Sequence, residues 1–319
     1  MKKLKLGSSG EELSTIGLGT WVHGGGDYAF GWGAQDDRES IASIKAAVEV
    51  GINWIDTAPV YGLGHSEEVL GQALKELPER PFIATKCGLR WDDATRKTYS
   101  LLKADSIRAE CEASLRRLGV DVIDLYQIHW PKPDEEIEEG WGAVADLVKE
   151  GKVRFGGVSN FSVDQMKRAQ EIHPITSLQP PYSMLERNVE SDILDFCSQH
   201  DIGVIAYSPL QKGLLTGKID HTYVEDMDDD DHRKAMDPKF RDPELSKILG
   251  KVEKLKVIAE RLGLTMTQLA VAWVLLRPEI TAAIVGARRS GQIRDVAPAS
   301  EVKLPEESVV EIEEVLSEV

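Results

Sequence analysis

The most constraining feature of this sequence is the regular alternation of short apolar segments with amphipathic helix patterns. Apolar segments typical of strands lie at about 15–21, 52–56, 82–86, 122–128, 153–158, 176–179, 203–207 and 281–285. Helix patterns alternate with them at about 37–50, 66–77, 105–118, 135–150, 162–172, 190–200, 246–262 and 289–297. This alternation favours a parallel sheet, and the eight repeats predict a closed (β/α)8 TIM barrel of the α/β class.

Segments outside the eight repeats add to this barrel. Residues 3–6 and 12–14 are typical of the two strands of an N-terminal β-hairpin. Two extra helix patterns lie at 265–277 and 305–318. Because no Pro- or Ser-rich linker interrupts the 319 residues, we predict a single domain over 1–319.

Composition narrows the class of partner and the compartment. The chain has 38 Lys and Arg against 54 Asp and Glu, a net charge of −16, which argues against nucleic acid and anionic membranes as partners. No signal peptide precedes Gly7, and the longest uncharged stretch, 262–276, is too short to cross a bilayer. Cys87, Cys111 and Cys197 lack metal-type spacing and predict reduced thiols. We therefore expect a cytoplasmic protein.

Polar side chains stand at the ends of three consecutive strand segments. Asp56, Lys86 and His129 end the second, third and fourth segments. Tyr61 follows Asp56 in a loop, and Ser66 is the predicted N-cap of the next helix. Because the carboxyl ends of parallel strands meet at one mouth of a barrel, Asp56, Tyr61, Lys86 and His129 should lie together.

These residue types suit acid–base chemistry at a carbonyl oxygen. A free tyrosine has a pKa of about 10, and an ammonium such as Lys86 stabilises the tyrosinate and lowers that pKa. Asp56 would keep Lys86 charged, and His129 would hydrogen-bond the substrate oxygen or relay a proton. Tyr61 would then exchange a proton with an oxygen whose carbon gains or loses hydride. Plain alternatives stay open: a structural ion pair, a tyrosine that anchors its loop, and a core histidine.

Three longer motifs give the sequence a family resemblance. They are GINWIDTAPVYGLGHSE at 51–67, SLRRL through DLYQIH at 114–129, and GKVR through GVSNF at 151–161. With them the chain resembles the aldo-keto reductases over nearly its whole length, in the pattern of the bacterial general-stress and inositol-dehydrogenase-like branch. The resemblance implies a catalytic tetrad of Asp56, Tyr61, Lys86 and His129, with Tyr61 as the acid.

The resemblance also implies a nicotinamide cofactor bound in extended form without a Rossmann domain. Carried over by position, Ser159, Asn160 and Gln179 would hold the carboxamide, and Tyr207 would stack on the nicotinamide ring. Gln179 precedes two prolines, so a strand-capping role is its alternative. The other implied contacts, at the nicotinamide end and the pyrophosphate, are Thr20, Trp21, Asp56, Ser208, Leu210, Gly213 and Lys218.

The segment 284–292 resembles the part of the family that holds the adenosine ribose. A strand leads there into a helix N-terminus, an arrangement that favours phosphate. The expected contacts are Gly286, Arg288 and Gln292. The planar fork of Arg288 suits a 2′-phosphate, so we expect NADPH, with NADH less favoured. Asp295 and Val296 stand where the family often has Glu and Asn, which argues against a polar contact to adenine.

The expected substrate is a small aldehyde, a ketone or the corresponding alcohol. The residues allow either direction, and loops set specificity on this fold. The predicted substrate pocket consists of Trp21, Tyr61, His129 and Trp130. Trp32 and the polar connection 220–242 should shape its rim. The glycine- and aromatic-rich loop 22–35 suits a pocket wall, with a merely packed loop as the alternative.

Two other functions stay open. One is a nicotinamide-nucleotide-binding regulatory subunit of a membrane channel, with little turnover. The other is a lyase or aldolase that uses Lys86 as a Schiff-base nucleophile.

Two further motifs carry less weight. The run 228–231 with His232 is typical of solvated carboxylates rather than a metal site, and 213–218 lacks the Ser or Thr of a P-loop.

Overall fold

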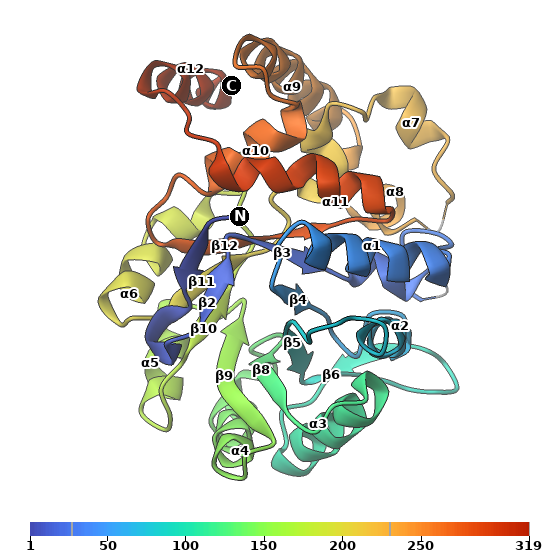
Figure 1. Ribbon diagram of the computed structural model, residues 1–319, viewed down its shortest axis with the longest axis vertical. Helices are drawn as coiled ribbons and strands as arrows, with labels where there is room; N and C mark the ends of the chain where they lie inside the picture. Colours follow the sequence, from blue (N-terminus) through green and yellow to red (C-terminus); the bar gives the residue numbers. More distant parts are fainter. Residues whose placement is uncertain (27, 230, 319) are drawn as a thin grey trace.

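The barrel predicted from the alternation is present. The structure is a computed structural model that describes residues 1–26, 28–229 and 231–318. Eight parallel strands close in the order β10-β11-β12-β3-β4-β5-β8-β9, which confirms the (β/α)8 TIM barrel (Figure 1). These strands are β3 (Ile16–Gly19), β4 (Trp54–Asp56), β5 (Phe82–Cys87), β8 (Ile123–Ile128), β9 (Val153–Ser159), β10 (Ser177–Gln179), β11 (Gly203–Ala206) and β12 (Ile280–Gly286).

Helices cover the outside of the barrel (Figure 1). They are α1 (Asp37–Glu49), α2 (His65–Leu74), α3 (Ala104–Leu118), α4 (Ile137–Lys149), α5 (Val163–Gln170), α6 (Ile193–Gln199), α9 (Glu244–Arg261), α10 (Met266–Val274), α11 (Ser290–Val296) and α12 (Glu306–Ser317). The two predicted extra helices are α10 and α12. Among the described residues, no single helix is long and apolar enough to span a membrane; α9 and α10 reach that length only as a pair bent by 92°.

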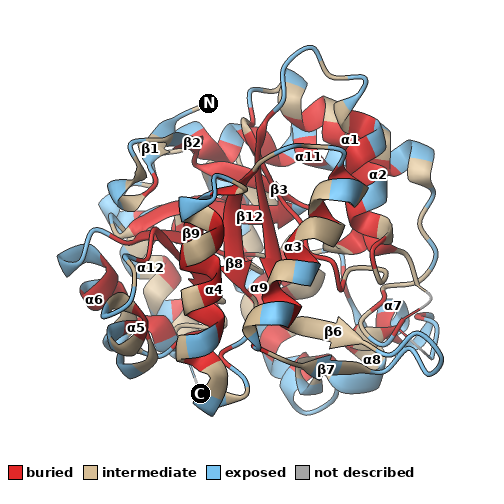
Figure 2. Cartoon of the chain, turned by 90° about the horizontal axis from the view of Figure 1, so that it is seen from below, coloured by how far each residue is buried: buried red, intermediate tan, exposed pale blue. Residues whose placement is uncertain are grey.

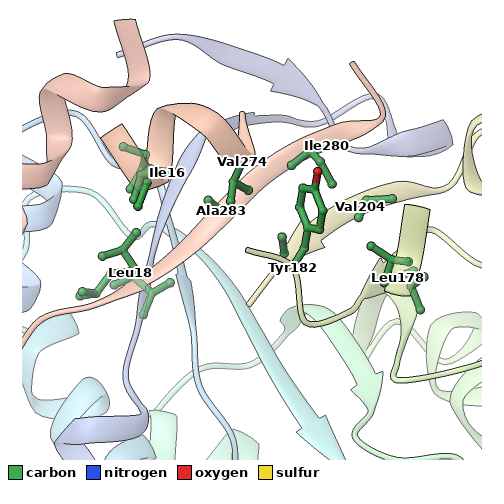
Figure 3. Packing of buried hydrophobic residues seen from close by; sticks show 14 of the residues in the cluster. Ile16, Leu18, Leu178, Tyr182, Val204, Val274, Ile280 and Ala283 are labelled. Atoms are coloured by element: carbon green, nitrogen blue, oxygen red, sulfur yellow. The ribbon is translucent and has the colours of Figure 1, made fainter. Parts of the chain in front are cut away.

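The barrel wall separates two apolar layers. Outward-facing strand residues such as Ile16, Leu178 and Val204 belong to the outer apolar layer beneath the helices, as does Val274 of α10 (Figure 3). The inner layer contains Trp54 and other side chains that fill the barrel. Exposed residues lie mainly on the outer faces of the helices, while the strands of the barrel are mostly buried (Figure 2). Each fully buried aliphatic side chain stabilises the fold by about 1.5–3 kcal/mol.

The predicted N-terminal hairpin closes the amino end of the barrel. Strand β1 (Lys3–Lys5) pairs antiparallel with β2 (Glu12–Ser14), which confirms it. Leu6 and Leu13 belong to the inner apolar layer and are at most 1% exposed. Gly7 has φ +48°, and a Cβ there would lie 2.5–2.6 Å from backbone atoms of three residues next to β10 and β11. The hairpin turn is therefore pressed against the barrel floor, where only glycine fits.

Strand β3 contains glycines because barrel side chains lie against its backbone. A Cβ on Gly17 would stand 2.2 Å from the Trp54 indole, and one on Gly19 would stand 2.7 Å from Cγ2 of Ile284. The close approach expected from the sequence is thus made by the inner layer itself.

The predicted N-cap of α2 is wrong. The helix begins at His65, and Gly64, with φ 105°, occupies the N-cap position. Ser66 is fully buried inside the first turn. Its hydroxyl lies 2.9 Å from the carbonyl oxygen and 2.8 Å from the hydroxyl of Thr20. Ser66 therefore ties α2 to the end of β3 instead of capping the helix.

The structure contains short elements beyond the predicted ones. Strands β6 (Leu89–Trp91) and β7 (Thr98–Ser100) form an antiparallel hairpin between β5 and α3. The polar connection 220–242 contains α7 (His221–Glu225) and α8 (His232–Met236). Asp220 and Asp231 cap these two helices, a signal that is visible in the sequence. Because β3 near one end of the chain pairs with β12 near the other, we infer a single domain.

Candidate active site

The four predicted catalytic side chains meet at the carboxyl end of the barrel. Nζ of Lys86 donates to Oδ1 of Asp56 at 2.6 Å, to the carbonyl of Thr57 at 3.0 Å and to Oη of Tyr61 at 3.3 Å. The rings of Tyr61 and His129 contact edge to face, with 5.9 Å between their centroids. Three strand ends and one loop thus place an acid, an ammonium, a phenol and an imidazole in one cluster.

Strand periodicity explains why this polar cluster lies above an apolar floor. Alternate residues of a strand face the same side of a sheet. On β4, Asp56 shares the inner face with Trp54, and on β5, Lys86 shares it with Ala84. Each strand therefore places an apolar residue in the barrel interior and, two residues later, a charged residue at the mouth.

Burial controls the ionisation of this cluster. Burial raises the pKa of Tyr61 well above its usual value of about 10, and the Asp56 carboxylate makes a smaller contribution in the same direction. Burial lowers the pKa of Lys86, and Asp56 opposes that shift. Burial and the Lys86 ammonium lower the pKa of His129 well below its usual value. The phenol and the imidazole are therefore neutral at pH 7.

The direction of the Tyr61 shift differs from the expectation. Lys86 alone would lower that pKa, but the adjacent Asp56 carboxylate offsets the ammonium, and burial penalises the tyrosinate. The pKa of Tyr61 is thus set by the ion pair as a unit and by the dry surroundings.

A network of amides continues from the tetrad. Gln179 Nε2 donates to Oδ2 of Asp56 at 2.8 Å, and Gln127 Nε2 donates to the same oxygen at 3.3 Å. Asn160 Nδ2 donates to the carbonyl of His129 at 3.0 Å, and its Oδ1 accepts from the Tyr207 hydroxyl at 2.9 Å. Both oxygens of Asp56 are therefore held in place.

Gln127 is a site residue that the sequence analysis missed. It is fully buried on β8, two residues before His129. Its position was the available signal, because Gln127 stands two residues before His129 and so faces the same side of the strand, where a buried amide needs partners.

Above the tetrad lies a cavity of about 700 Å³. Most of the predicted cofactor and substrate residues line it, namely Trp21, Asp56, Tyr61, His129, Trp130, Ser159, Asn160, Gln179, Tyr207, Ser208, Leu210, Gly213, Lys218, Gly286, Arg288 and Gln292. Two predicted residues lie behind its wall. Lys86 is fully buried beneath Tyr61, and the Thr20 hydroxyl donates to the carbonyl of Asp56 at 3.2 Å.

Aromatic rings form the walls at the tetrad end of the cavity. Trp21 stacks beside Tyr61, with 6.1 Å between centroids and 19° between planes. Trp32 meets Trp21 edge-on at 5.3 Å. Trp130 is 37% exposed and lies at the rim. His232, from the polar connection, contacts Trp21 at 6.0 Å, so that connection does border the cavity as expected.

Two glycines allow this wall to lie close to the catalytic loop. Gly62 has φ +64°, and a Cβ on it would stand 2.2 Å from the carbonyl oxygen of Gly24. The loop that carries Trp21 therefore touches the loop that carries Tyr61, backbone against backbone.

The far end of the cavity is basic. Lys218 and Arg288 line it, the first exposed and the second half-buried, while the exposed Arg289 follows Arg288 in the chain outside the lining. Oε1 of Gln292 accepts from the backbone N–H of Arg288 at 2.8 Å and of Arg289 at 3.2 Å. Between the two ends the backbone is strained, because Ser208, Gln211 and Lys212 have φ of 45–56°.

The acidic run near this end is partly described. Asp231 pairs with Arg233 at 2.7 Å and caps α8, while Asp230 lies outside the described residues. In the part of the chain that the structure describes, no group of three His, Cys, Asp or Glu is arranged to hold a metal ion. The three cysteines are buried and unpaired.

The fold and this site define the class of (β/α)8-barrel oxidoreductases. The profile of the Aldo/keto reductase family matches residues 15–317, and the chain belongs to that family. The resemblance found in the sequence motifs is therefore confirmed. Members of this family use nicotinamide cofactors and act on small molecules.

Individual relatives support the assignment over almost the whole chain. Aldo-keto reductase YhdN of Bacillus subtilis is 39% identical, over 99% of this chain and 94% of its own length. The NADH-specific methylglyoxal reductase of Escherichia coli is 36% identical, over 95% of both chains. The solved structure of a glycerol dehydrogenase from Gluconobacter oxydans is 40% identical with a TM-score of 0.89, covering 99% of this chain and 95% of that one.

Proposed function

We propose that this protein transfers hydride between NADPH and a small carbonyl compound, reducing aldehydes or ketones to alcohols or running the reverse reaction. Tyr61 is the general acid or base. The observation that carries this proposal is the Tyr61 hydroxyl, 3.3 Å from the buried ammonium of Lys86, beside a cavity of about 700 Å³.

The residues of the cavity fit a nicotinamide dinucleotide in extended form. Asn160 and Gln179 supply amide groups beside the tetrad, and both line the cavity. The opposite end offers the cations of Lys218 and Arg288, which suit phosphate groups. The strained backbone between the ends is typical of ligand-binding loops. When bound, the cofactor supplies or accepts hydride at the carbon of the substrate.

The protein side of the reaction is a proton exchange at the substrate oxygen. In reduction, the neutral Tyr61 phenol donates its proton to that oxygen, and the resulting tyrosinate is stabilised by Lys86. Asp56 holds the ammonium in position at 2.6 Å. His129, neutral at pH 7, hydrogen-bonds the substrate oxygen. General acid catalysis of this kind contributes about 10²–10⁴-fold in rate.

Small oxygenated compounds are the substrates that we propose. One relative is a methylglyoxal reductase and a structural neighbour is a glycerol dehydrogenase. Trp21, Trp32 and Trp130 narrow the tetrad end of the cavity and exclude water from the reacting atoms. A short carbonyl compound or polyol suits this aromatic enclosure.

The lyase alternative conflicts with the position of Lys86. Its side chain is 1% exposed, and its ammonium already donates three hydrogen bonds. A Schiff-base lysine must instead present a free amine to the substrate carbon. The geometry therefore favours a positioning role for Lys86.

The test is cofactor consumption by wild type and Tyr61→Phe, with NADPH and NADH in parallel. Methylglyoxal, glyceraldehyde and dihydroxyacetone serve as oxidants, and glycerol tests the reverse reaction. We expect faster turnover with NADPH and at least a ~100-fold lower kcat for Tyr61→Phe with unchanged cofactor affinity. Tyr99→Phe, on the exposed strand β7, is the matched control. Tight cofactor binding without turnover on any substrate would instead support the regulatory-subunit alternative.

A further inference from the structure

Arg288, two residues after β12, is bonded to the loop between β3 and α1. Its Nε donates to Oε1 of Gln35 at 2.9 Å, and its Nη1 donates to the carbonyl of Trp32 at 3.1 Å. Its Nη2 donates to the carbonyl of Ala34. Gln35 in turn donates from Nε2 to the carbonyl of Arg288 at 2.9 Å. The loop therefore engages all three guanidinium nitrogens and the backbone of Arg288.

These bonds occupy three of the five N–H donors of the guanidinium, among them the single N–H of Nε. A guanidinium binds a phosphate best through one of its two edges, each of which presents a parallel pair of N–H groups. The Nε edge is taken, because Nε has a single hydrogen and donates it to Gln35. On the other edge, each terminal nitrogen gives one of its two hydrogens to a loop carbonyl. A phosphate that binds the Nε edge of Arg288 with two hydrogen bonds therefore competes with Gln35.

The surroundings of Arg288 favour an anion. Arg288 lines the cavity, and burial, together with the neighbouring cations Arg233 and Arg289, lowers its pKa. Arg233 stacks on the Trp32 ring at 4.9 Å and pairs with Asp231, while Arg289 is exposed. The amide and carbonyl oxygens of the loop have no net charge, so they offset the mutual repulsion of these cations less than a phosphate does.

Building on the proposed function, we propose that Gln35 sets the preference between NADPH and NADH by competing with the 2′-phosphate for Arg288. With NADPH the guanidinium leaves Gln35, and with NADH it stays on the loop. The same loop places Phe30 and Trp32 on the cavity wall. The choice of cofactor therefore also changes how firmly the substrate end of the cavity is held.

The test uses two nucleotides that lack nicotinamide, adenosine 2′,5′-bisphosphate and 5′-AMP. Isothermal titration gives the ratio of their dissociation constants, which isolates the 2′-phosphate. We expect Gln35→Ala to raise the preference for the bisphosphate about fivefold, because one competing hydrogen bond is lost. Gln35→Glu should lower it at least tenfold, because a carboxylate binds Arg288 more strongly than an amide does. Gln72→Ala, an exposed glutamine on α2, should leave it unchanged.

Amide hydrogen exchange of residues 28–36 provides a second readout. In wild type, the bisphosphate should speed the exchange of these amides, and 5′-AMP should not. In Gln35→Ala, the same amides should exchange quickly even without a ligand. If the ratio of the two dissociation constants is the same in wild type, Gln35→Ala and Gln35→Glu, the proposal is overturned. A purely structural role of Gln35 would weaken the binding of both nucleotides by the same factor. If wild type binds neither nucleotide, the cofactor part of the proposed function fails first, and this proposal fails with it.

Discussion

Two buried carboxylates lie at opposite ends of the barrel, and both are bonded to cations. At the carboxyl end, Asp56 pairs with Lys86 at 2.6 Å. At the amino end, Asp124 pairs with Arg80 and Arg154 at 2.9 Å each and accepts from the backbone N–H of Ile83. Both carboxylates are at most 3% exposed.

The two ion pairs differ in the exposure of their cations and in the other groups that the cations contact. Arg80 and Arg154 are about 40% exposed, at 39% and 41%, and the hairpin closes the floor beside them. Lys86 is buried and gives its last bond to a phenol that faces a cavity. A buried ion pair at a strand end is therefore not enough to make a site. The site also needs a proton-bearing partner and space for a substrate.

Removal of the two cations should separate these roles most clearly. We expect Lys86→Met to lower kcat at least ~10³-fold, because the tyrosinate loses its counter-charge and Asp56 loses its partner. Arg154→Met should leave kcat within about twofold. Steady-state kinetics on the substrate panel measure both values. An equal loss of kcat in the two variants would show that the ion pairs at the two ends of the barrel do not differ in their roles.

The carboxylate at the amino end should matter for stability instead. Asp124→Asn leaves Arg80 and Arg154 without their anion, but both side chains can turn into water, so we expect a loss of about 2 kcal/mol in the free energy of unfolding. The kcat should not change. Urea unfolding measures the effect, with Asp121→Asn on the surface as the matched control. A kcat that falls together with stability would contradict the separation.

A third buried acid, Glu110, has no bonded cation among the described residues and extends the comparison. It accepts from Gly88 N–H and from the Ser106 hydroxyl, each at 3.0 Å, and burial raises its pKa to about 7 from 4.5. The folded state therefore binds more protons than the unfolded state between these values, and stability from this group falls as pH rises through that window.

Glu110→Gln removes this titration. Between pH 5 and pH 8 we expect wild type to lose about 2 kcal/mol more than the variant in the free energy of unfolding. Parallel denaturant curves at the two pH values measure the difference, with Glu68→Gln on the exposed face of α2 as control. Identical pH profiles for wild type and Glu110→Gln would show that Glu110 is charged throughout.

The smallest expected effect is that of pH on kcat, because no catalytic side chain should change its charge near neutral pH. The pKa of Tyr61 is raised and that of His129 is lowered, so both keep their neutral forms from pH 6 to pH 8. The kcat of carbonyl reduction should then vary by less than about twofold across that range. A half-maximal point near pH 6.5 would mean that His129 exchanges the proton.

The sequence is sufficient to predict the barrel and the tetrad, because both depend on strand ends. Strand ends are visible locally, from the apolar alternation and the polar residue that follows. This local signal locates Asp56, Lys86 and His129. The loop signals after Asp56 place Tyr61 beside them, and the family motifs then supply most of the residues that line the cavity.

Features that depend on distant partners could not be predicted. The bond between Arg288 and Gln35 joins positions 253 residues apart, and no local pattern indicates it. The pKa of Tyr61 depends on burial and on both charges of an ion pair, so Lys86 alone gave the wrong direction. Ser66 looked like an N-cap because its burial against Thr20 is invisible in the sequence.

Closure of the barrel by β3 and β12 has a consequence for synthesis. The partner residues of Ile16 and Gly17 are Ala283 and Ile284. The first barrel strand therefore cannot complete its pairing until the last barrel strand has been synthesised. At about 5–20 residues per second, that wait is on the order of 10–60 seconds. During this time one edge of β3 is unpaired, and nascent chains are most prone to aggregate through such edges. A chain that stops before Ile280 contains every tetrad residue but cannot close the barrel around them.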